Sequence, residues 1–239
     1  MTDPDKFPNY ARRNLKRELL SALEKGHDVN QQNSNGQSAL YFACAIHHNT
    51  HNEILHVLLQ QHTLRINYLH PFTWSPILIA CICVNYSSLL ILSQDPRTDI
   101  NLIDLYGWTP CIAAASSTEI KLLQVLLASG RKINLEARTT KTMRPMDVSF
   151  AVKDGMNAFD VAKLRNNEEA FSLLQDYQKN QSKTVDNLRT ILDLKSTLSF
   201  SFSFSFSFSF SFSFPFLLFL PLVKMSVFSY LIFSFHSYL

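Results

Sequence analysis

Glycine is scarce in this sequence, and its scarcity excludes whole classes of site. The chain has five glycines, at positions 26, 36, 107, 130 and 155. A phosphate-binding loop needs glycines close together, and the nucleophile elbow of the α/β hydrolases needs a GxSxG run. Neither can be assembled from this set. No pattern singles out paired carboxylates for acid–base work either, so we expect no enzyme and no cofactor.

The four cysteines include no CxxC pair. Cys44, Cys81, Cys83 and Cys111 each lie in an apolar run, as in YFACAI, IACICV and TPCIAAA. This setting predicts small buried side chains in a reducing compartment, and it argues against a disulfide framework or a zinc site. The N-terminus MTDPDKFPNYARR has no apolar core and is therefore not a secretory signal. We expect the body of the chain to be cytoplasmic.

One group of side chains invites a metal interpretation. Cys44, His47 and His51 would share a face if a helix continued through all three. Against a metal, Cys44 falls in an Ala-rich apolar stretch, and His47 lies where that helix is expected to end. A polar loop between two helices explains HHNTH equally, and a fourth ligand is missing. We expect no metal.

The charge of the chain is close to balanced once its C-terminal tail is set aside. Lys224 is the only basic residue after Lys195, which leaves 21 basic and 19 acidic residues in the body. The cluster Arg12, Arg13, Lys16 and Arg17 is interpreted as a solvated helix face, with phosphate binding as the alternative. We therefore expect no nucleic acid as a partner.

A repeat runs through the body. An aliphatic residue followed by Asn recurs at Asn30, Asn67, Asn101 and Asn134, in steps of 37, 34 and 33 residues. After each of the first three comes a turn and then a Ser or Thr that opens an Ala-rich stretch: SALYFACAI, SPILIACIC and TPCIAAAS, with GMNAFDVAK as a fourth copy. The hydroxyl residue predicts a helix N-cap, and Pro76 and Pro110 suit the first helical position.

A second apolar segment with helical spacing follows each of these stretches. The segments are EILHVLLQ, SLLILSQ, IKLLQVLLASG and EAFSLLQDY, and ELLSALEKG precedes the first unit. Gly26 and Gly130 each lie four residues before a repeat Asn, where a helix-ending Gly is expected. Two helices per unit, in units of similar length, predict an all-α fold.

This pattern resembles the ankyrin repeat, a turn plus two helices with a period of about 33 residues and a TPLH-type helix start. The resemblance covers roughly residues 14–177. It implies an all-α ankyrin-repeat solenoid of helix-turn-helix units with finger turns. The family's His is absent, since Tyr41, Leu78, Ile112 and Asp160 occupy its places, and Thr73 replaces one turn Gly.

The resemblance and the composition together predict the domain organisation. Its parts are an N-terminal extension 1–13, a half unit 14–32, units 33–69, 70–103 and 104–136, an insertion 137–152, a last unit 153–177, a capping helix 178–195 and a tail 196–239. In the capping helix, Val185, Leu188 and Leu192 share one face that would close the apolar end of the stack.

Arrays of this family bind other proteins through finger tips and the inner helix face, which implies a non-catalytic protein-binding adaptor. Register places Phe72, Trp74, Leu105, Tyr106 and Trp108 on that surface, and the finger lengthened by the insertion adds Arg138, Lys141 and Arg144. Two alternatives stay open at this point. The two Trp side chains could instead pack on neighbouring turns, and the long finger could be a disordered insertion.

The tail is of low complexity. Ser199–Phe214 is eight Ser-Phe pairs, and 28 uncharged residues separate Lys195 from Lys224. That length exceeds the ~20 residues of a membrane-spanning helix, but Ser alternates with Phe, and Pro215 and Pro221 interrupt the most apolar part. The interpretations are a low-complexity or mis-called extension, an aggregation-prone segment, or a tail anchor. A membrane-tethered adaptor, anchored through residues 199–239 only, is thus the alternative function and location.

Overall fold

The described part of the chain is all helical. The structure, a computed structural model, describes residues 5–46, 49–69, 74–140 and 153–194, and these contain no strand but one isolated antiparallel bridge between Gln32 and Ser38. The helices are α1 Lys6–Arg12, α2 Lys16–Glu24, α3 Ala39–Ala45, α4 Asn49–Leu59, α5 Pro76–Ile82, α6 Tyr86–Gln94, α7 Pro110–Ser116, α8 Ile120–Ala128, α9 Ala158–Leu164, α10 Glu168–Lys179 and α11 Gln181–Ile191.

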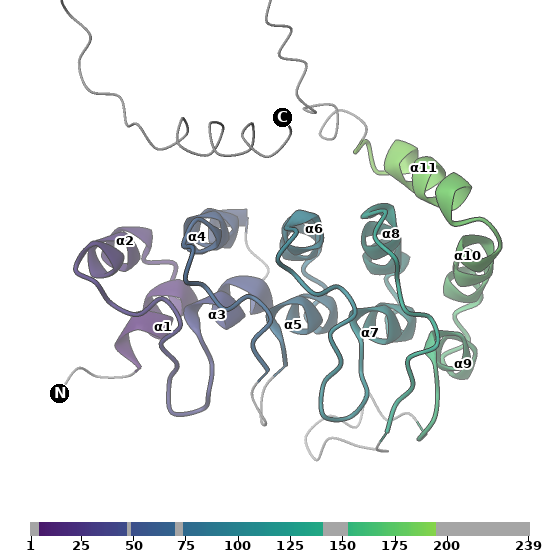
Figure 1. The fold of residues 1–239 in the computed structure, drawn as a ribbon, viewed down its shortest axis with the longest axis horizontal. Coiled ribbons are helices and arrows are strands. Elements are labelled where there is room, and N and C mark those ends of the chain that lie inside the picture. The colour runs from purple at the N-terminus through teal and green to yellow at the C-terminus, as the bar shows by residue number, and fades with distance from the viewer. Residues whose placement is uncertain (1–4, 47–48, 70–73, 141–152, 195–239) are drawn as a thin grey trace, which may run out of the picture. The chain divides into compact units, whose positions relative to one another are not determined.

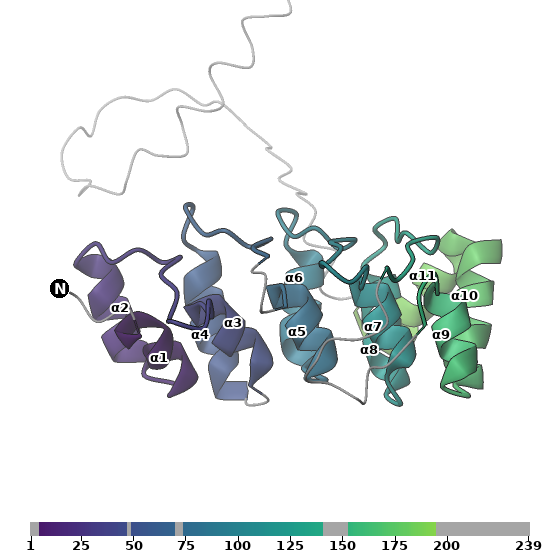
Figure 2. The same cartoon turned by 90° about the horizontal axis from the view of Figure 1, so that it is seen from below.

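Within this part the helices form pairs that stack side by side (Figures 1 and 2). The first helices of the pairs, α1, α3, α5, α7 and α9, contact one another in sequence and make one row. The second helices, α2, α4, α6 and α8, follow each other in a second row. The core lies between the rows, where Leu40, Leu78 and Ile112 of the first helices and Leu89 and Leu122 of the second are fully buried.

The starts of the first helices follow the predicted capping chemistry. The side chains of Ser38, Ser75 and Thr109 accept hydrogen bonds from the backbone N–H groups three residues on, at 3.1, 3.3 and 3.2 Å. Pro76 and Pro110 occupy the first turn, where no intrahelical N–H bond is lost. These predictions are confirmed. At the start of α9, Asn157 forms a capping box with Asp160 instead.

The recurring Asn residues link each unit to the next. Asn30, Asn67 and Asn101 donate from Nδ2 to a carbonyl oxygen one unit ahead, at 2.8–2.9 Å, and accept a backbone N–H there at 2.7–2.8 Å. The carbonyls belong to Thr63, Arg97 and Lys132, and the N–H groups to Arg65, Asp99 and Asn134. The aliphatic residue before each Asn is buried. Each loop is therefore held by an apolar contact with the core and by the hydrogen bonds of the Asn to the next unit.

The N-terminal segment differs from its prediction. Residues 1–13 were expected to be an extension, but Lys6–Arg12 form α1, which packs on α2 and α3 and makes the half unit a full helix pair. Phe7 and Ala11 are fully buried, and the Arg12 guanidinium carbon lies 5.8 Å from the ring centroid of Phe42. The sequence hid this helix because its N-cap, Asp5, makes no side-chain cap bond and no Ala run follows.

The capping helix forms as predicted, but it packs elsewhere than expected. Val185 and Leu188 of α11 are buried, and α11 contacts α8 and α10 (Figure 1). Arg189 donates from Nε to the carbonyl of Ala128 at 3.0 Å and from a terminal nitrogen to that of Ser129 at 3.3 Å. These carbonyls end α8, so α11 extends the second-helix row instead of covering the outer face of α9.

That outer face carries its own polar cover. Lys163 lies six residues after the N-cap of α9, and the equivalent residue of α7 is Ala115. Phe171 lies four residues after the N-cap of α10, and the equivalent residue of α8 is Leu123. Ala115 and Leu123 are fully buried by the next unit. In the last pair the Lys163 ammonium instead lies 4.7 Å from the centroid of the Phe171 ring. A charged group over an aromatic face is compatible with solvent at this position.

Candidate protein-binding surface

The finger of the fourth helix pair, residues 102–108, is a tight turn held by one carboxylate. Asp104 accepts hydrogen bonds from the backbone N–H groups of Tyr106 and Trp108 at 2.9 and 2.8 Å, and its own N–H donates to the Trp108 carbonyl at 3.0 Å. Gly107 has φ +78, and a Cβ there would overlap the backbone of Arg138 and Thr140 in the next finger. The turn is therefore fixed both internally and by its neighbour.

The fixed turn presents apolar side chains to solvent. Leu105 is 60% exposed, Ile103 is 46% exposed, and Leu69, which lies 34 residues before Ile103 in the preceding unit, is 37% exposed. These are three of the six large hydrophobic residues exposed in the described chain. We call them the finger strip: Leu69, Ile103 and Leu105. Clustered exposed apolar residues mark interaction surfaces more often than scattered ones do.

The predicted surface residues divide into three groups. Leu105 is exposed and Tyr106 is half-buried, in keeping with a surface position. Trp108 is only 8% exposed and Trp74 is half-buried against the core, so the packing alternative describes Trp108. Phe72, Lys141 and Arg144 lie outside the described residues, as do most of the insertion 137–152 and the tail 196–239.

The base of the long finger is ordered around Thr139. This buried side chain donates to the carbonyl of Lys153 at 2.7 Å and accepts from the backbone N–H of Met156 at 3.1 Å. Thr140 donates its N–H to the Tyr106 carbonyl at 2.9 Å, which ties this base to the preceding finger. Arg138 is exposed, donates to the Gly155 carbonyl at 2.7 Å and lies 3.6 Å from the Asp160 carboxylate.

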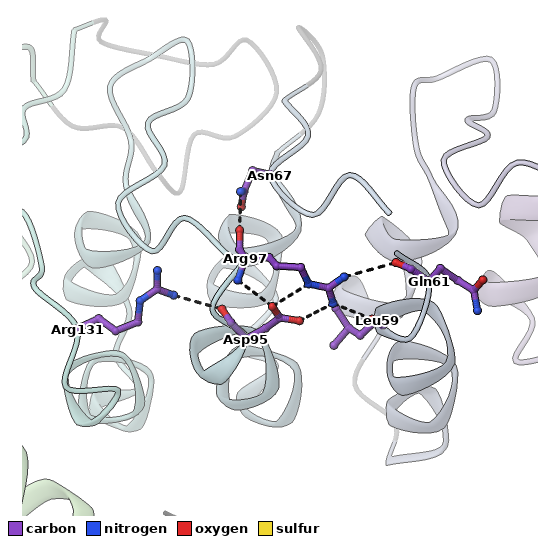
Figure 3. A network of polar contacts seen from close by, with 6 residues as sticks. All are labelled: Leu59, Gln61, Asn67, Asp95, Arg97 and Arg131. Carbon is purple, nitrogen blue, oxygen red and sulfur yellow. Dashed lines mark hydrogen bonds and ion pairs between the residues drawn. The ribbon is translucent and has the colours of Figure 1, made fainter. Parts of the chain in front are cut away.

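A polar network holds the loops that lead into the fingers (Figure 3). Arg97 binds both carboxylate oxygens of Asp95 at 3.1 and 2.7 Å and donates to the carbonyls of Leu59 and Gln61, at the end of α4 in the preceding unit. Arg131 reaches back in the same way to the Asp95 carbonyl at 3.4 Å. The side-chain hydrogen bonds of Arg97 lower the pKa of Asp95 below its usual value.

The network has a consistent logic along the second-helix row. Arg97, Arg131 and Arg189 each donate to a carbonyl at or just beyond the end of the preceding second helix, α4, α6 and α8 respectively. The C-terminal end of a helix carries partial negative charge and unbonded carbonyls, so a cation there is favourable. Each of these arginines thus supplies a donor to the helix end of the preceding unit, and this bond fixes the loop that carries the arginine.

The described residues offer little for chemistry. Burial raises the pKa of Cys111 to about 12 and those of Cys44 and Cys81 further, so these buried cysteines are thiols at neutral pH. In the same described residues, no group of three His, Cys, Asp or Glu side chains is placed to hold a metal ion. The side chains of the candidate ligands His47 and His51 are not among those that the structure describes, so that alternative lies outside it.

Among the helices described, none has the length and apolar character required to cross a membrane. The tail-anchor alternative concerns residues 199–239, which the structure does not describe.

The sequence signals of the finger strip were present but not used. Leu69 and Ile103 each lie two residues after a repeat Asn, at the position held by Gln32 and Glu136 in the outer units. An apolar residue at this position in the two middle units alone is a deviation that register alignment makes visible. Leu105 was found from its place at the finger tip.

Comparison with known proteins adds a distant relationship. No protein-family model matches the chain. The chain is 27% identical over 159 residues to SMC5-SMC6 complex localization factor protein 1 of Homo sapiens, and 29% identical over 150 residues to the Bos taurus protein of the same name. These matches cover 65% and 60% of this chain but only 14% and 13% of the relatives, so the chain corresponds to a small part of their length.

Proposed function

We propose that this chain is an ankyrin-repeat protein that acts as a non-catalytic adaptor and binds a partner protein through its finger strip. The observation that carries the proposal is the exposure of Ile103 and Leu105 on a turn held by Asp104, with Leu69 exposed at the position equivalent to Ile103 in the preceding unit. A rigid apolar surface loses little conformational entropy on binding, which favours affinity.

The assignment to the ankyrin class has independent support. Helix pairs repeat at the spacing of the family, Ser or Thr with Pro opens the first helices, and loops rich in turn residues join consecutive pairs. The relatives are named as localization factors of the SMC5-SMC6 complex. Subunits of that complex are therefore the first partners to test, and a localising role for this chain is part of the proposal.

The test compares partners recovered from cells for two matched variants. Ile103→Ser with Leu105→Ser removes two exposed apolar side chains of the finger strip. Ile191→Ser removes one that is 68% exposed on α11, far from the fingers in sequence. Interface residues of this kind cost about 1 kcal/mol or more when truncated, hence roughly a fivefold or larger loss of bound partner per residue.

We expect SMC5–SMC6 subunits, or another defined protein, to be recovered with the wild type and with Ile191→Ser but lost with the finger double variant. Circular dichroism should show both variants folded, because neither changes a buried side chain. An identical partner set for the two variants would contradict the proposal.

A further inference from the structure

A second surface lies at the opposite end of the first helices from the fingers. A groove of about 590 Å³ spans the C-terminal ends of three first helices, α5, α7 and α9. It is lined by Cys81, Ile82, Val84, Ala113, Ser116, Ser117, Thr118, Arg165, Asn166 and Asn167. Because fingers precede the first helices and turns follow them, this groove and the finger strip are separate sites.

The groove is lined by apolar side chains, hydroxyl groups and one cation. One flank is apolar, with Ile82 and Val84, and the middle carries three neighbouring hydroxyl groups from Ser116 to Thr118. Among the described residues that line the groove, Arg165 is the only charged one and none carries a carboxylate. The nearby Glu119 already accepts the Tyr86 hydroxyl at 2.8 Å. A ligand that fits must supply an apolar group and a negative charge.

The backbone of the groove is strained at one residue. Val84 has φ +56, in the left-handed region that β-branched residues rarely adopt. The equivalent positions after α1 and α9 are Asn14 and Asn166, at φ +57 and +53, and Asn tolerates this conformation. Val84 therefore keeps an apolar side chain in the groove at a conformational cost. Such strain tends to concentrate at binding sites.

We propose that this groove binds an acidic segment of a partner protein. An apolar side chain of that segment packs on Ile82 and Val84, while an Asp or Glu carboxylate two to four residues away accepts hydrogen bonds from Arg165 and from the hydroxyls of Ser117 and Thr118. The Ser116 hydroxyl already donates to the Ala113 carbonyl at 2.8 Å. The inference goes beyond the finger strip and adds the chemistry of a second contact. It depends on the proposed adaptor function only in that the ligand is a protein.

The test selects ligands without assuming their identity. A display library of random 12-residue peptides is sorted on the immobilised full-length chain, and the enriched peptides are measured by fluorescence anisotropy. We expect enrichment of Asp or Glu near Leu, Ile or Val. Arg165→Glu should weaken these peptides at least tenfold, as the loss of a charge-assisted hydrogen bond predicts, and Arg165→Lys should weaken them less.

Matched variants make the result specific. Lys132→Glu reverses an exposed charge on a loop outside the groove and should change the affinity less than twofold. Thr118→Glu introduces a negative charge at an exposed groove position, without touching the core, and should weaken binding as Arg165→Glu does. A peptide with Lys in place of its acidic residue should bind Arg165→Glu better than it binds the wild type.

Several outcomes overturn the groove proposal. These are the absence of enriched acidic peptides, or equal binding of the enriched peptides to Arg165→Glu and to the wild type. Peptides that are lost with the finger double variant but not with Arg165→Glu would refute the groove and still support the adaptor. An identical partner set in cells for the finger double variant and for Ile191→Ser, with peptides bound normally at the groove, would instead refute the finger strip alone.

Discussion

The finger ends and the turn ends of the first helices are stabilised by different kinds of side chain. At the finger ends, Ser38, Ser75 and Thr109 cap their own helices over three residues of sequence. At the turn ends, Asn85 caps α6 and also donates to the carbonyls of Cys44 and Ile46, 41 and 39 residues away. The caps at the finger ends are thus local, whereas the cap at this turn end also joins two units.

Asn167 repeats the bridging role in the last helix pair. Its Oδ1 caps α10 and its Nδ2 donates to the Ser117 carbonyl at 2.7 Å. In the one pair between them, Glu119 takes this position and makes no side-chain cap bond. Local capping therefore recurs from unit to unit, whereas a cap residue that also donates to a carbonyl of the preceding unit occurs at Asn85 and Asn167. Four substitutions break or sharpen this contrast.

The largest effect is expected at the finger end. Gly107→Ala forces a left-handed residue to carry a Cβ and pushes that Cβ into the backbone of Arg138 and Thr140. We expect a loss of about 3 kcal/mol in the free energy of unfolding, measured by urea denaturation. Gly26→Ala is the control, because Gly26 has a similar φ of +82 but open space around it, and it should cost about 1 kcal/mol. Equal losses would show that the contact between fingers does not matter.

The next effect concerns the bridge at the turn end. Asn85→Ala removes the cap of α6 and leaves two buried carbonyls without their donor. We expect a loss of about 2 kcal/mol in the free energy of unfolding. Thr109→Ala, which removes a cap only, should cost about 1 kcal/mol by the same measurement. A cost for Asn85→Ala no larger than that of Thr109→Ala would remove the distinction between the two ends.

A gain is expected from relieving the strain beside this bridge. Val84→Asn replaces a β-branched residue at φ +56 with one that adopts this conformation readily. The free energy of unfolding should rise by about 1 kcal/mol, and Asn166→Val should lower it by a similar amount. Thermal unfolding of both variants measures this. Destabilisation by Val84→Asn would mean that the apolar contact of Val84 outweighs its strain.

The smallest effect is a pH dependence of the network in Figure 3. The pKa of Asp95 is lowered in the folded chain, chiefly by its hydrogen bonds from Arg97. Its stabilisation is therefore present above the unfolded-state pKa of about 3.9 and is lost as the pH falls through the lower folded-state value. Asp95→Asn should be less stable than the wild type at about pH 7 by under 1 kcal/mol, and the difference should shrink at about pH 3. A difference that does not change with pH would contradict this origin.

The sequence predicted the exposure of a surface residue where that exposure depends on neighbouring residues in the chain, and failed where it depends on packing between units. Leu105 could be placed from sequence because a finger tip is exposed whatever surrounds it. Trp108 could not, because its burial depends on packing against the core formed by other units. The groove was not anticipated, since Val84, Ser117 and Arg165 come together only when three helix ends are stacked.

The sequence by itself determined the helices other than α1, the caps of the first helices and the register of the repeats. These depend on hydrogen bonds over three or four residues and on apolar spacing within one helix, which are written in consecutive positions. The tertiary structure alone decided the pairing of α1 with the first unit, the docking of α11 on α8 and α10, and the reach of Arg97 and Arg189 to carbonyls 38 and 61 residues away. Contacts between residues so far apart in the sequence depend on which helix surfaces pack together, and a pattern in consecutive residues does not determine that packing.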